Sequence, residues 1–330
     1  MKIANDKPRI CVATVAYNNP EELSALFESI ARQTRPIDGL IVIDNSEKID
    51  FIDSNKRIFN SLLPDVSYKK YIAMDKNRGS AHGFKKGMEI AHANGFDWVW
   101  LLDQDGIADE KCLKFLAEVA NEADVLCPKV LAIEDGSSEL TFRSNINFWG
   151  DFVPIFVGKT TEHRVMTVFA THGVMISRLA IDKTGYFDDK NFFCGWEDHD
   201  YSLRLKEHNC SMILIPEAVV YHPDLAVKYK KIKPTKLAIT SRAFLFINSI
   251  CTLPPFLGTA TNEGTELEEI RRKTRLVLFR KYVRGFRFWV TILFSMFCLS
   301  MMKVTGRKVS FLDSFVMYLE LVRYNPREDE

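Results

Sequence analysis

Residues 98–106 read WVWLLDQDG, an apolar run that ends directly in two aspartates, Asp103 and Asp105. A short apolar run followed by polar turn residues is typical of a buried strand. In extended backbone, residues i and i+2 project to the same side, so both carboxylates face one point at the end of this strand. Two oxygen ligands at an open sheet edge suit Mg²⁺ or Mn²⁺, although a polar turn closing a strand explains a lone D-x-D equally well.

On both sides of this run, short apolar stretches alternate with helical patterns. The expected elements are strands at Arg9–Ala16, Gly39–Asp44, Ser67–Met74, Trp98–Leu102, Ala170–Ser177 and Ser211–Tyr221, and helices at Pro20–Thr34, Ser80–Asn94 and Glu197–His208, with a further helix and short strand between Asp109 and Val130. This alternation predicts an α/β protein with a mostly parallel sheet covered on both faces. In such sheets, ligands bind beyond the carboxyl ends of the strands.

Composition narrows the class of protein. The chain has 330 residues and a formal net charge of +1, which gives no global attraction to nucleic acid, so no nucleic-acid partner is expected. Its seven cysteines are scattered and show no C-x-x-C spacing, which argues against a zinc module and indicates a reducing compartment. The polar N-terminus shows no secretory signal. We expect one domain over residues 1–234 and a helical, basic and apolar region over 235–330.

A second acidic cluster lies in the stretch Trp196–Tyr201, which reads WEDHDY. Acids near the start of a helix are favoured by its dipole, so capping explains one or two of them. Three acids in four residues beside Trp196 point further, because mutual repulsion raises the proton affinity of at least one carboxylate. Such a carboxylate can serve as a general base.

Two further motifs fall at element ends. His222 directly follows the apolar stretch 212–221, and a neutral imidazole is a good ligand for Mn²⁺-class metals, although a histidine at a strand end is also a common polar terminus. Residues 77–84 read NRGSAHGF, and closely spaced glycines before a helix let backbone approach a phosphate. The same pattern also fits a tight turn, and it matches neither the dinucleotide fingerprint nor the P-loop.

Taken in order, these motifs resemble glycosyltransferase family 2, whose members share the GT-A fold. The matching stretches are VATVAYNNPEEL, IVIDNSE, NRGSAHGF, WLLDQDG, THGVMIS, TGYFDD, WEDHDYSLRL and AVVYHPD, which together span roughly residues 9–225. The NRGSAHGF and WEDHDY forms look most similar to bacterial galactofuranosyl- and rhamnosyltransferases of surface-polysaccharide assembly. The resemblance therefore implies a doubly wound, mixed and mostly parallel GT-A sheet. The segment Glu134–Thr167 matches nothing in the family.

The resemblance also implies roles for the matching residues. These are nucleoside or donor contacts at Thr14, Tyr17, Asp44, Asn77, Gly79 and Gln104, metal ligands at Asp103, Asp105 and His222, a sugar or acceptor pocket at His172, Gly173 and Trp196, and catalytic residues at Asp198 (the base) and Glu197. Asp105 would bind the metal most directly. The middle residue of the D-x-D, Gln104, is expected to point away from the metal.

The mechanism implied by the resemblance is a single inverting displacement. Mn²⁺ or Mg²⁺ would stabilise the charge on the departing nucleotide diphosphate, and Asp198 would take the proton of the acceptor hydroxyl. The expected donor is UDP- or dTDP-linked, with galactofuranose or rhamnose as the sugar. The expected acceptor is a polyprenyl-diphosphate-linked glycan.

The last third of the chain suggests contact with a membrane. Eight Lys and Arg residues lie between Arg271 and Arg287, directly before the uncharged stretch Phe288–Met302. These 15 residues are short for a spanning helix. A shallow helix on anionic lipids at the cytoplasmic face is expected, with a buried core helix as the alternative and a spanning helix as the third choice. Phe311–Val322 would pack on it or on a second copy in a homo-oligomer.

Other functions fit parts of the sequence. A nucleotidyltransferase also uses paired acids on an α/β sheet, but it typically needs a glycine-rich basic loop near the N-terminus, which VATVAYNNPEE lacks. A membrane scaffold that only binds a nucleotide sugar would not need a base at Asp198. A transferase that uses a UDP-hexose donor is a further alternative.

Overall fold

The computed structural model describes residues 7–140, 142–146 and 152–224, with Thr274, Val277, Leu278, Lys281 and Tyr282 beyond them. The chain divides into two compact units, the first made of residues 1–145, 152–193 and 197–231. The expected membrane segment 288–302 and the helix 311–322 lie outside the described residues, and the boundary near residue 234 stays a prediction. Among the described helices, none has the length and apolarity needed to cross a membrane.

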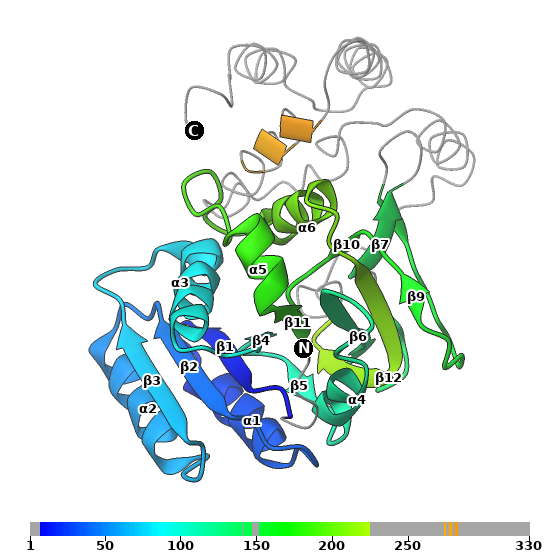
Figure 1. Ribbon diagram of the computed structural model, residues 1–330. Helices are drawn as coiled ribbons and strands as arrows, with labels where there is room; N and C mark the ends of the chain where they lie inside the picture. The colour runs from blue at the N-terminus through cyan, green and yellow to red at the C-terminus, as the bar shows by residue number, and fades with distance from the viewer. Residues whose placement is uncertain are drawn as a thin grey trace, which may run out of the picture. The chain divides into compact units, whose positions relative to one another are not determined.

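The first unit is built from strands and helices in alternation (Figure 1). In chain order they are β1 (Ile10–Ala16), α1 (Pro20–Ala31), β2 (Gly39–Asp44), α2 (Ile49–Ser61), β3 (Tyr68–Ala73), α3 (Gly79–Ala93), β4 (Trp98–Asp103), β5 (Ile107–Ala108), α4 (Cys112–Glu118), β6 (Val125–Ala132), β7 (Arg143–Ile146), β8 (Phe152–Pro154), β9 (Arg164–Val165), β10 (Val168–Phe169), β11 (Val174–Ser177), α5 (Arg178–Thr184), α6 (Glu197–Glu207) and β12 (Met212–His222).

The main sheet has the strand order β3-β2-β1-β4-β11-β6-β12-β5, and β9 pairs with β12. Strands β3, β2, β1 and β4 run parallel to one another, and β12 runs parallel to β6. Strand β11 lies between β4 and β6 and runs antiparallel to both. The sheet is therefore the mixed, mostly parallel α/β sheet that the sequence predicts, and a small second sheet has the order β10-β7-β8.

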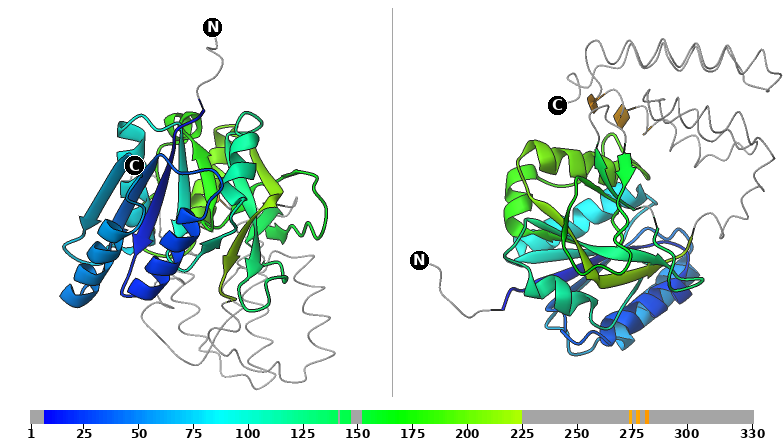
Figure 2. Two further views of the ribbon diagram at one scale, coloured as in Figure 1. Left: turned by 90° about the horizontal axis from the view of Figure 1, so that it is seen from below. Right: turned by 90° about the vertical axis from the view of Figure 1, so that its right-hand side faces the viewer.

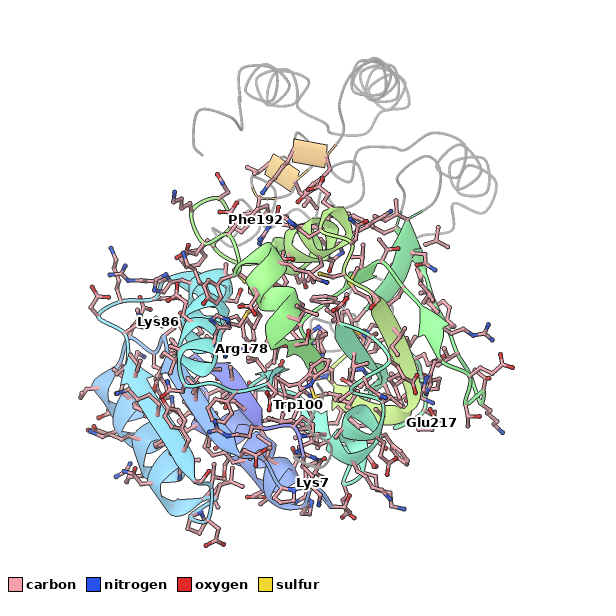
Figure 3. All side chains as sticks on the ribbon, viewed as in Figure 1. Lys7, Lys86, Trp100, Arg178, Phe192 and Glu217 are labelled. Atoms are coloured by element: carbon pink, nitrogen blue, oxygen red, sulfur yellow. The ribbon has the colours of Figure 1, made fainter. Side chains whose placement is uncertain are left out.

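Helices cover both faces of the main sheet, as Figures 1 and 2 show. One buried cluster joins the sheet to α3, α5 and α6 through residues such as Phe84, Ile181 and Tyr201. The other joins the opposite face to α1, α2 and α4, and the side chain of Trp100 lies within it (Figure 3). Because β4 is buried on both faces, its sequence is a continuous apolar run rather than an alternation.

Several elements have no counterpart among the expected ones, among them α5, β5, β9 and β10, and two cases show why. Helix α2 buries only Asn55 and Phe59, so its sequence lacks the apolar stripe that marks a helix packed on a core. The segment 134–159, which could not be assigned from its pattern, contributes β7 and β8 of the small sheet. These strands have four and three residues, too few for an alternating pattern to be recognised.

Candidate metal and catalytic site

The end of β4 meets the start of β11, and this brings Asp103 beside His172. The antiparallel register pairs Val174 with Leu101, and its continuation places His172 opposite Asp103. Asp103 Oδ2 and His172 Nδ1 lie 2.6 Å apart, yet they are not aligned as a hydrogen bond, and neither buried atom has another hydrogen-bond partner. Burial lowers the pKa of His172 more than the charge of Asp103 raises it, so the imidazole is neutral at pH 7.

His222 reaches the same place from the end of β12. Strand β5 pairs Tyr221 with Ile107, which sets His222 beside the turn that contains Asp105. Its Nε2 lies 3.1 Å from Asp105 Oδ1, and its Nδ1 donates to the Pro223 carbonyl at 2.9 Å. Burial by itself lowers the pKa of His222, but the hydrogen bond to Asp105 and the charge of Asp105 together outweigh it and raise the pKa.

Asp103, His172 and His222 together form a candidate metal-binding group. One ligand atom from each lies within 4.8 Å of the others. The two imidazole rings are 4.0 Å apart, and the ring of Phe142 lies 4.2 Å from that of His172. A carboxylate with two imidazoles suits Mn²⁺-class ions, and the two unsatisfied atoms of Asp103 and His172 are ones that a metal would satisfy. The residues present therefore fit a divalent ion.

The expected metal ligands thus meet at one place, with two differences in detail. His172, expected in the sugar pocket, belongs to this group. Asp105, expected to bind the metal most directly, instead contacts the imidazole of His222. Which of these residues bind a metal stays a prediction.

Glu197 begins α6 and is almost completely buried, at 5% exposure. Ser80, from the second residue of α3, donates to its Oε1, while its Oε2 has no hydrogen-bond partner. Burial and the neighbouring charge of Asp198 raise the pKa of Glu197 to about 8. Glu197 therefore carries a proton at pH 7 and presents a neutral carboxyl.

Asp198, in contrast to Glu197, is ionised at pH 7. Its Oδ1 accepts from the backbone N–H of His199 at 2.7 Å and contacts the His199 ring Nδ1 at the same distance. Burial alone would raise the pKa of Asp198, but the charge and hydrogen bonds of His199 outweigh burial and lower it. A proton on His172 would also lower this pKa, so the two clusters lie within electrostatic range of each other.

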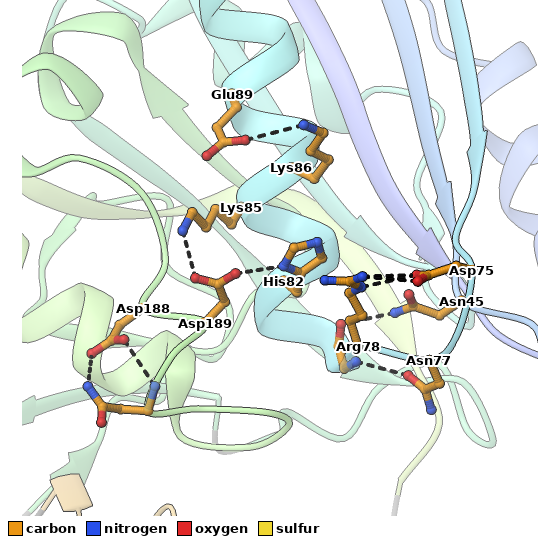
Figure 4. Close-up of polar contacts among 12 residues, drawn as sticks. Asn45, Asp75, Asn77, Arg78, His82, Lys85, Lys86, Glu89, Asp188 and Asp189 are labelled. Carbon is orange, nitrogen blue, oxygen red and sulfur yellow. Dashed lines mark hydrogen bonds and ion pairs between the residues drawn. The ribbon is translucent and has the colours of Figure 1, made fainter. Parts of the chain in front are cut away.

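Residues 77–79 of the NRGSAHGF motif form a tight turn at the start of α3 (Figure 4). Asn77 Oδ1 accepts from the Gly79 N–H, and Asn45 Nδ2 donates to the Gly79 carbonyl, both at 2.9 Å. Gly79 has φ +82°, and a Cβ there would lie 1.9 Å from the Phe193 carbonyl oxygen. Only glycine fits this position, because the loop before α6 packs directly on it.

An ionic contact ties the same loop to α3. Asp189 binds the His82 ring Nδ1 and Lys85 Nζ, each at 2.6 Å (Figure 4). These contacts draw the chain before α6 onto α3 and so set Glu197 against Ser80. Figure 4 shows His82 and Lys85 on one face of α3, both turned toward Asp189.

Asp44, expected to contact the nucleoside, is fully buried at the end of β2. Its Oδ1 accepts from the Ser46 N–H at 2.8 Å, and its Oδ2 accepts from Asn55 Nδ2 at 2.9 Å and from the Tyr71 hydroxyl. Asp44 therefore joins β2, α2 and β3, and a contact with a nucleoside stays a prediction.

Gln104 is bound to the loop that follows β1. Its amide accepts from the Tyr17 N–H at 2.6 Å and donates to the Tyr17 carbonyl at 3.0 Å and to Glu22 at 3.2 Å. The side chain thus orders the segment expected to hold the nucleoside. Tyr17 itself is 42% exposed, and Thr14 is buried with an unpartnered Oγ1.

Gly173 and Trp196, expected in the sugar pocket, both have left-handed backbone conformations. Gly173 has φ +76° and accepts from Trp100 Nε1 at 2.9 Å, and a Cβ there would lie 2.6 Å from Val220. Trp196 has φ +74°, which is rare for an aromatic residue and typical of functional sites. A contact of either residue with a sugar stays a prediction.

Sequence reasoning missed several residues of the site. Arg143 is 2% exposed and donates to the His172 carbonyl at 2.6 Å. His199 holds Asp198, and Phe142 packs on His172. Phe142 and Arg143 lie in the segment that matches no motif, so no pattern marks them. His199 lies inside WEDHDY, and its place next to Asp198 is the one signal that could have found it.

Comparison with known families identifies the class. The model described as "Glycosyl transferase family 2" matches residues 11–185, and the chain belongs to this family. Two solved structures share its fold. The crystal structure of GalNAc-T7 with UDP, GalNAc and Mn²⁺ has a TM-score of 0.52 at 16% identity, covering 83% of this chain and 57% of that chain. The mannosyltransferase PcManGT from Pyrobaculum calidifontis, in complex with GDP-Man and Mn²⁺, has a TM-score of 0.50 at 12% identity, covering 98% of this chain and 83% of that chain.

Relatives by sequence carry transferase names. The galactofuranosyltransferase GlfT1 of Mycobacterium tuberculosis is 35% identical over 129 residues, which cover 38% of this chain and 41% of that protein. The uncharacterized glycosyltransferase YwdF of Bacillus subtilis is 25% identical over 217 residues, which cover 62% of this chain and 73% of that protein. The matched stretch thus spans about two fifths of the mycobacterial protein. The predicted family and GT-A fold are confirmed.

Proposed function

We propose that this protein is an inverting, metal-dependent glycosyltransferase that moves a sugar from a nucleotide diphosphate to a lipid-linked glycan. The observation that carries the proposal is that its acidic residues differ in surroundings and charge state. Asp103 meets two histidines in a group that fits a divalent ion, while Asp198 is ionised beside a protonated Glu197. A module that only binds nucleotide sugar has no use for a buried, ionised carboxylate beside the ligand.

The residues of the chain divide the reaction between them. Asp103, His172 and His222 would hold a divalent ion, Mn²⁺ or Mg²⁺, which when bound would supply a Lewis acid for the charge on the departing nucleotide diphosphate. Asp198 takes the proton from the acceptor hydroxyl. As it does so, the hydroxyl oxygen bonds to the anomeric carbon and the bond from that carbon to the diphosphate breaks. Glu197, protonated at pH 7, donates a hydrogen bond to a sugar hydroxyl through its free carboxyl oxygen.

For the donor, we propose UDP-galactofuranose or dTDP-rhamnose. Support comes from the 35% identity to a protein named as a galactofuranosyltransferase and from the WEDHDY form of the acidic motif. A UDP-hexose is the alternative donor. For the acceptor, we propose a polyprenyl-diphosphate-linked glycan in surface-polysaccharide synthesis. The basic stretch Arg271–Arg287 beside the uncharged stretch Phe288–Met302 supports a peripheral position at the cytoplasmic face of the membrane.

A donor screen tests the proposal. The purified chain is incubated with Mn²⁺ or Mg²⁺, a panel of nucleotide sugars and a synthetic lipid-linked acceptor, and transfer and donor hydrolysis are measured. One donor is expected to react, with activity lost on chelation and in Asp103→Ala and Asp198→Ala. Asp182→Ala is the matched control, because Asp182 is half exposed and pairs with His92 away from the acidic centre.

The outcomes separate the alternatives. Activity that survives chelation and both substitutions would show that the metal group and the base are wrongly assigned. Well-folded protein that binds a nucleotide sugar but neither transfers nor hydrolyses it would favour the scaffold.

A further inference from the structure

Arg143, the first residue of β7, is a buried arginine whose partners among the described residues are main-chain carbonyls. Its side chain is 2% exposed. The accepting carbonyls are those of Pro128 at 3.0 Å, Phe142 at 3.0 Å, Ala170 at 2.8 Å and His172 at 2.6 Å. In the described part of the chain, no carboxylate pairs with it. The guanidinium is thus satisfied by hydrogen bonds, and no carboxylate of the described residues contacts it.

Stability alone is a poor reason for such a residue. Removing a guanidinium from water costs several kcal/mol, and its hydrogen bonds to neutral carbonyls only offset that cost. A well-packed apolar side chain often stabilises an interior equally well. A buried arginine with a rigid fork is better explained by geometry, because the fork fixes several carbonyls relative to one another.

The geometry in question is that of the chain leading to His172. The pairing of β7 with β10 sets Arg143 opposite Phe169, and the guanidinium then binds the carbonyls of Ala170 and His172 in the following segment. The residue before the arginine, Phe142, places its ring 4.2 Å from the His172 ring. Arg143 and its neighbour therefore hold His172 by both its backbone and its side chain.

We propose that Arg143 is a positioning residue that orients His172 for metal binding through its hydrogen bond to the His172 carbonyl. The proposal rests on the proposed function, because it takes Asp103, His172 and His222 as the metal site. Metal ligands need placement to within about half an ångström, which a rigid supporting contact provides. A positive charge repels a cation, so loss of the Arg143 charge alone would tighten metal binding, whereas loss of positioning weakens it.

Mn²⁺ binding tests this difference in sign. Free Mn²⁺ is measured by electron paramagnetic resonance with the full chain, in the absence and presence of UDP. Arg143→Met is expected to weaken Mn²⁺ binding at least about tenfold, and Arg143→Lys, which keeps the repelling charge but loses the fork, to weaken it as well. Arg178→Met is the matched control, because Arg178 binds the His92 carbonyl at 2.7 Å outside the metal group (Figure 3) and should leave Mn²⁺ affinity unchanged.

A double-mutant cycle with His172→Ala completes the test. If Arg143 acts through His172, Arg143→Met causes no further loss once His172 is absent. Mn²⁺ affinity that is unchanged or tighter in Arg143→Met, or losses that add in the double variant, would overturn the proposal. Should Arg143→Met fail to fold by circular dichroism, wild-type affinity in Arg143→Lys would overturn it. Wild-type protein that binds no Mn²⁺ under either condition would also overturn it. These experiments measure Mn²⁺ affinity and not sugar transfer. A donor screen that finds no active donor would therefore count against the proposed function and not against this inference.

Discussion

Two aspartates end the strands on either side of β1, and the fold treats them differently. Asp44 on β2 is fully buried, and its carboxylate accepts hydrogen bonds from three groups of the protein. Asp103 on β4 is a quarter exposed, and its Oδ2 faces His172 without a hydrogen bond. Asp44 is therefore structural, because groups of the protein satisfy its hydrogen-bonding capacity. Asp103 stays available to a ligand, because its Oδ2 has no such partner.

The largest expected effect is at Asp198, the proposed general base. Asp198→Asn keeps the shape of the side chain but cannot accept a proton. Transfer should fall by about 10²- to 10⁴-fold, which is the usual contribution of a general base. Turnover at saturating donor is the measurement, with nucleotide affinity as the control that should hold. Turnover within a few fold of wild type would place the base elsewhere.

Asp44→Asn should act on stability instead. The new NH₂ group faces donors that the carboxylate now accepts from, including Asn55 and Tyr71. Leaving such buried groups unmatched costs about 1–3 kcal/mol, measurable by urea unfolding. Asp182→Asn, at a half-exposed position, is the control and should cost far less. Unchanged stability with lost nucleotide affinity would instead assign Asp44 to the nucleoside, as the family resemblance implies.

Glu197→Gln should change the pH dependence of stability. The folded-state pKa of Glu197, about 8, lies above its ordinary value of 4.5, so the folded protein holds the extra proton between these limits. Stability should therefore fall as pH rises through this window, by at most about 1.4 kcal/mol per pH unit from this group. Glu197→Gln, a permanently neutral mimic, should flatten the slope. Unfolding midpoints from pH 5 to 8.5 give the comparison, and equal slopes in both proteins would mean that Glu197 is ionised.

The smallest expected effect is at Gln104. Gln104→Ala removes the bonds to both backbone groups of Tyr17, so the loop after β1 loosens. The loss should be about 1 kcal/mol, seen as a roughly fivefold higher donor KM with kcat unchanged. A change confined to kcat would show that Gln104 acts on the metal group rather than on the loop.

The sequence predicts the strands that carry Asp44 and Asp103, because both follow apolar runs of the expected length. It cannot predict which of the two carboxylates is saturated, since the partners Asn55 and Tyr71 come from α2 and β3, far along the chain and without a motif. That distinction depends on tertiary contacts, which no local pattern encodes.

The same reason explains the placement of His172. A strand near residues 170–177 is predictable, but its antiparallel direction between β4 and β6 is not. That direction turns the start of β11 toward the end of β4 and so brings His172 to Asp103. With a parallel strand, His172 would lie at the opposite edge of the sheet.

The most direct test compares Mn²⁺ affinity in Asp103→Asn and Asp44→Asn, the same substitution at the two neighbouring strand ends. Free Mn²⁺ is measured with the full chain in the presence of UDP, after circular dichroism has shown both variants to be folded. The metal site described here predicts that Asp103→Asn weakens Mn²⁺ binding by at least about tenfold while Asp44→Asn leaves it unchanged. Equal affinities in wild type and Asp103→Asn would contradict it.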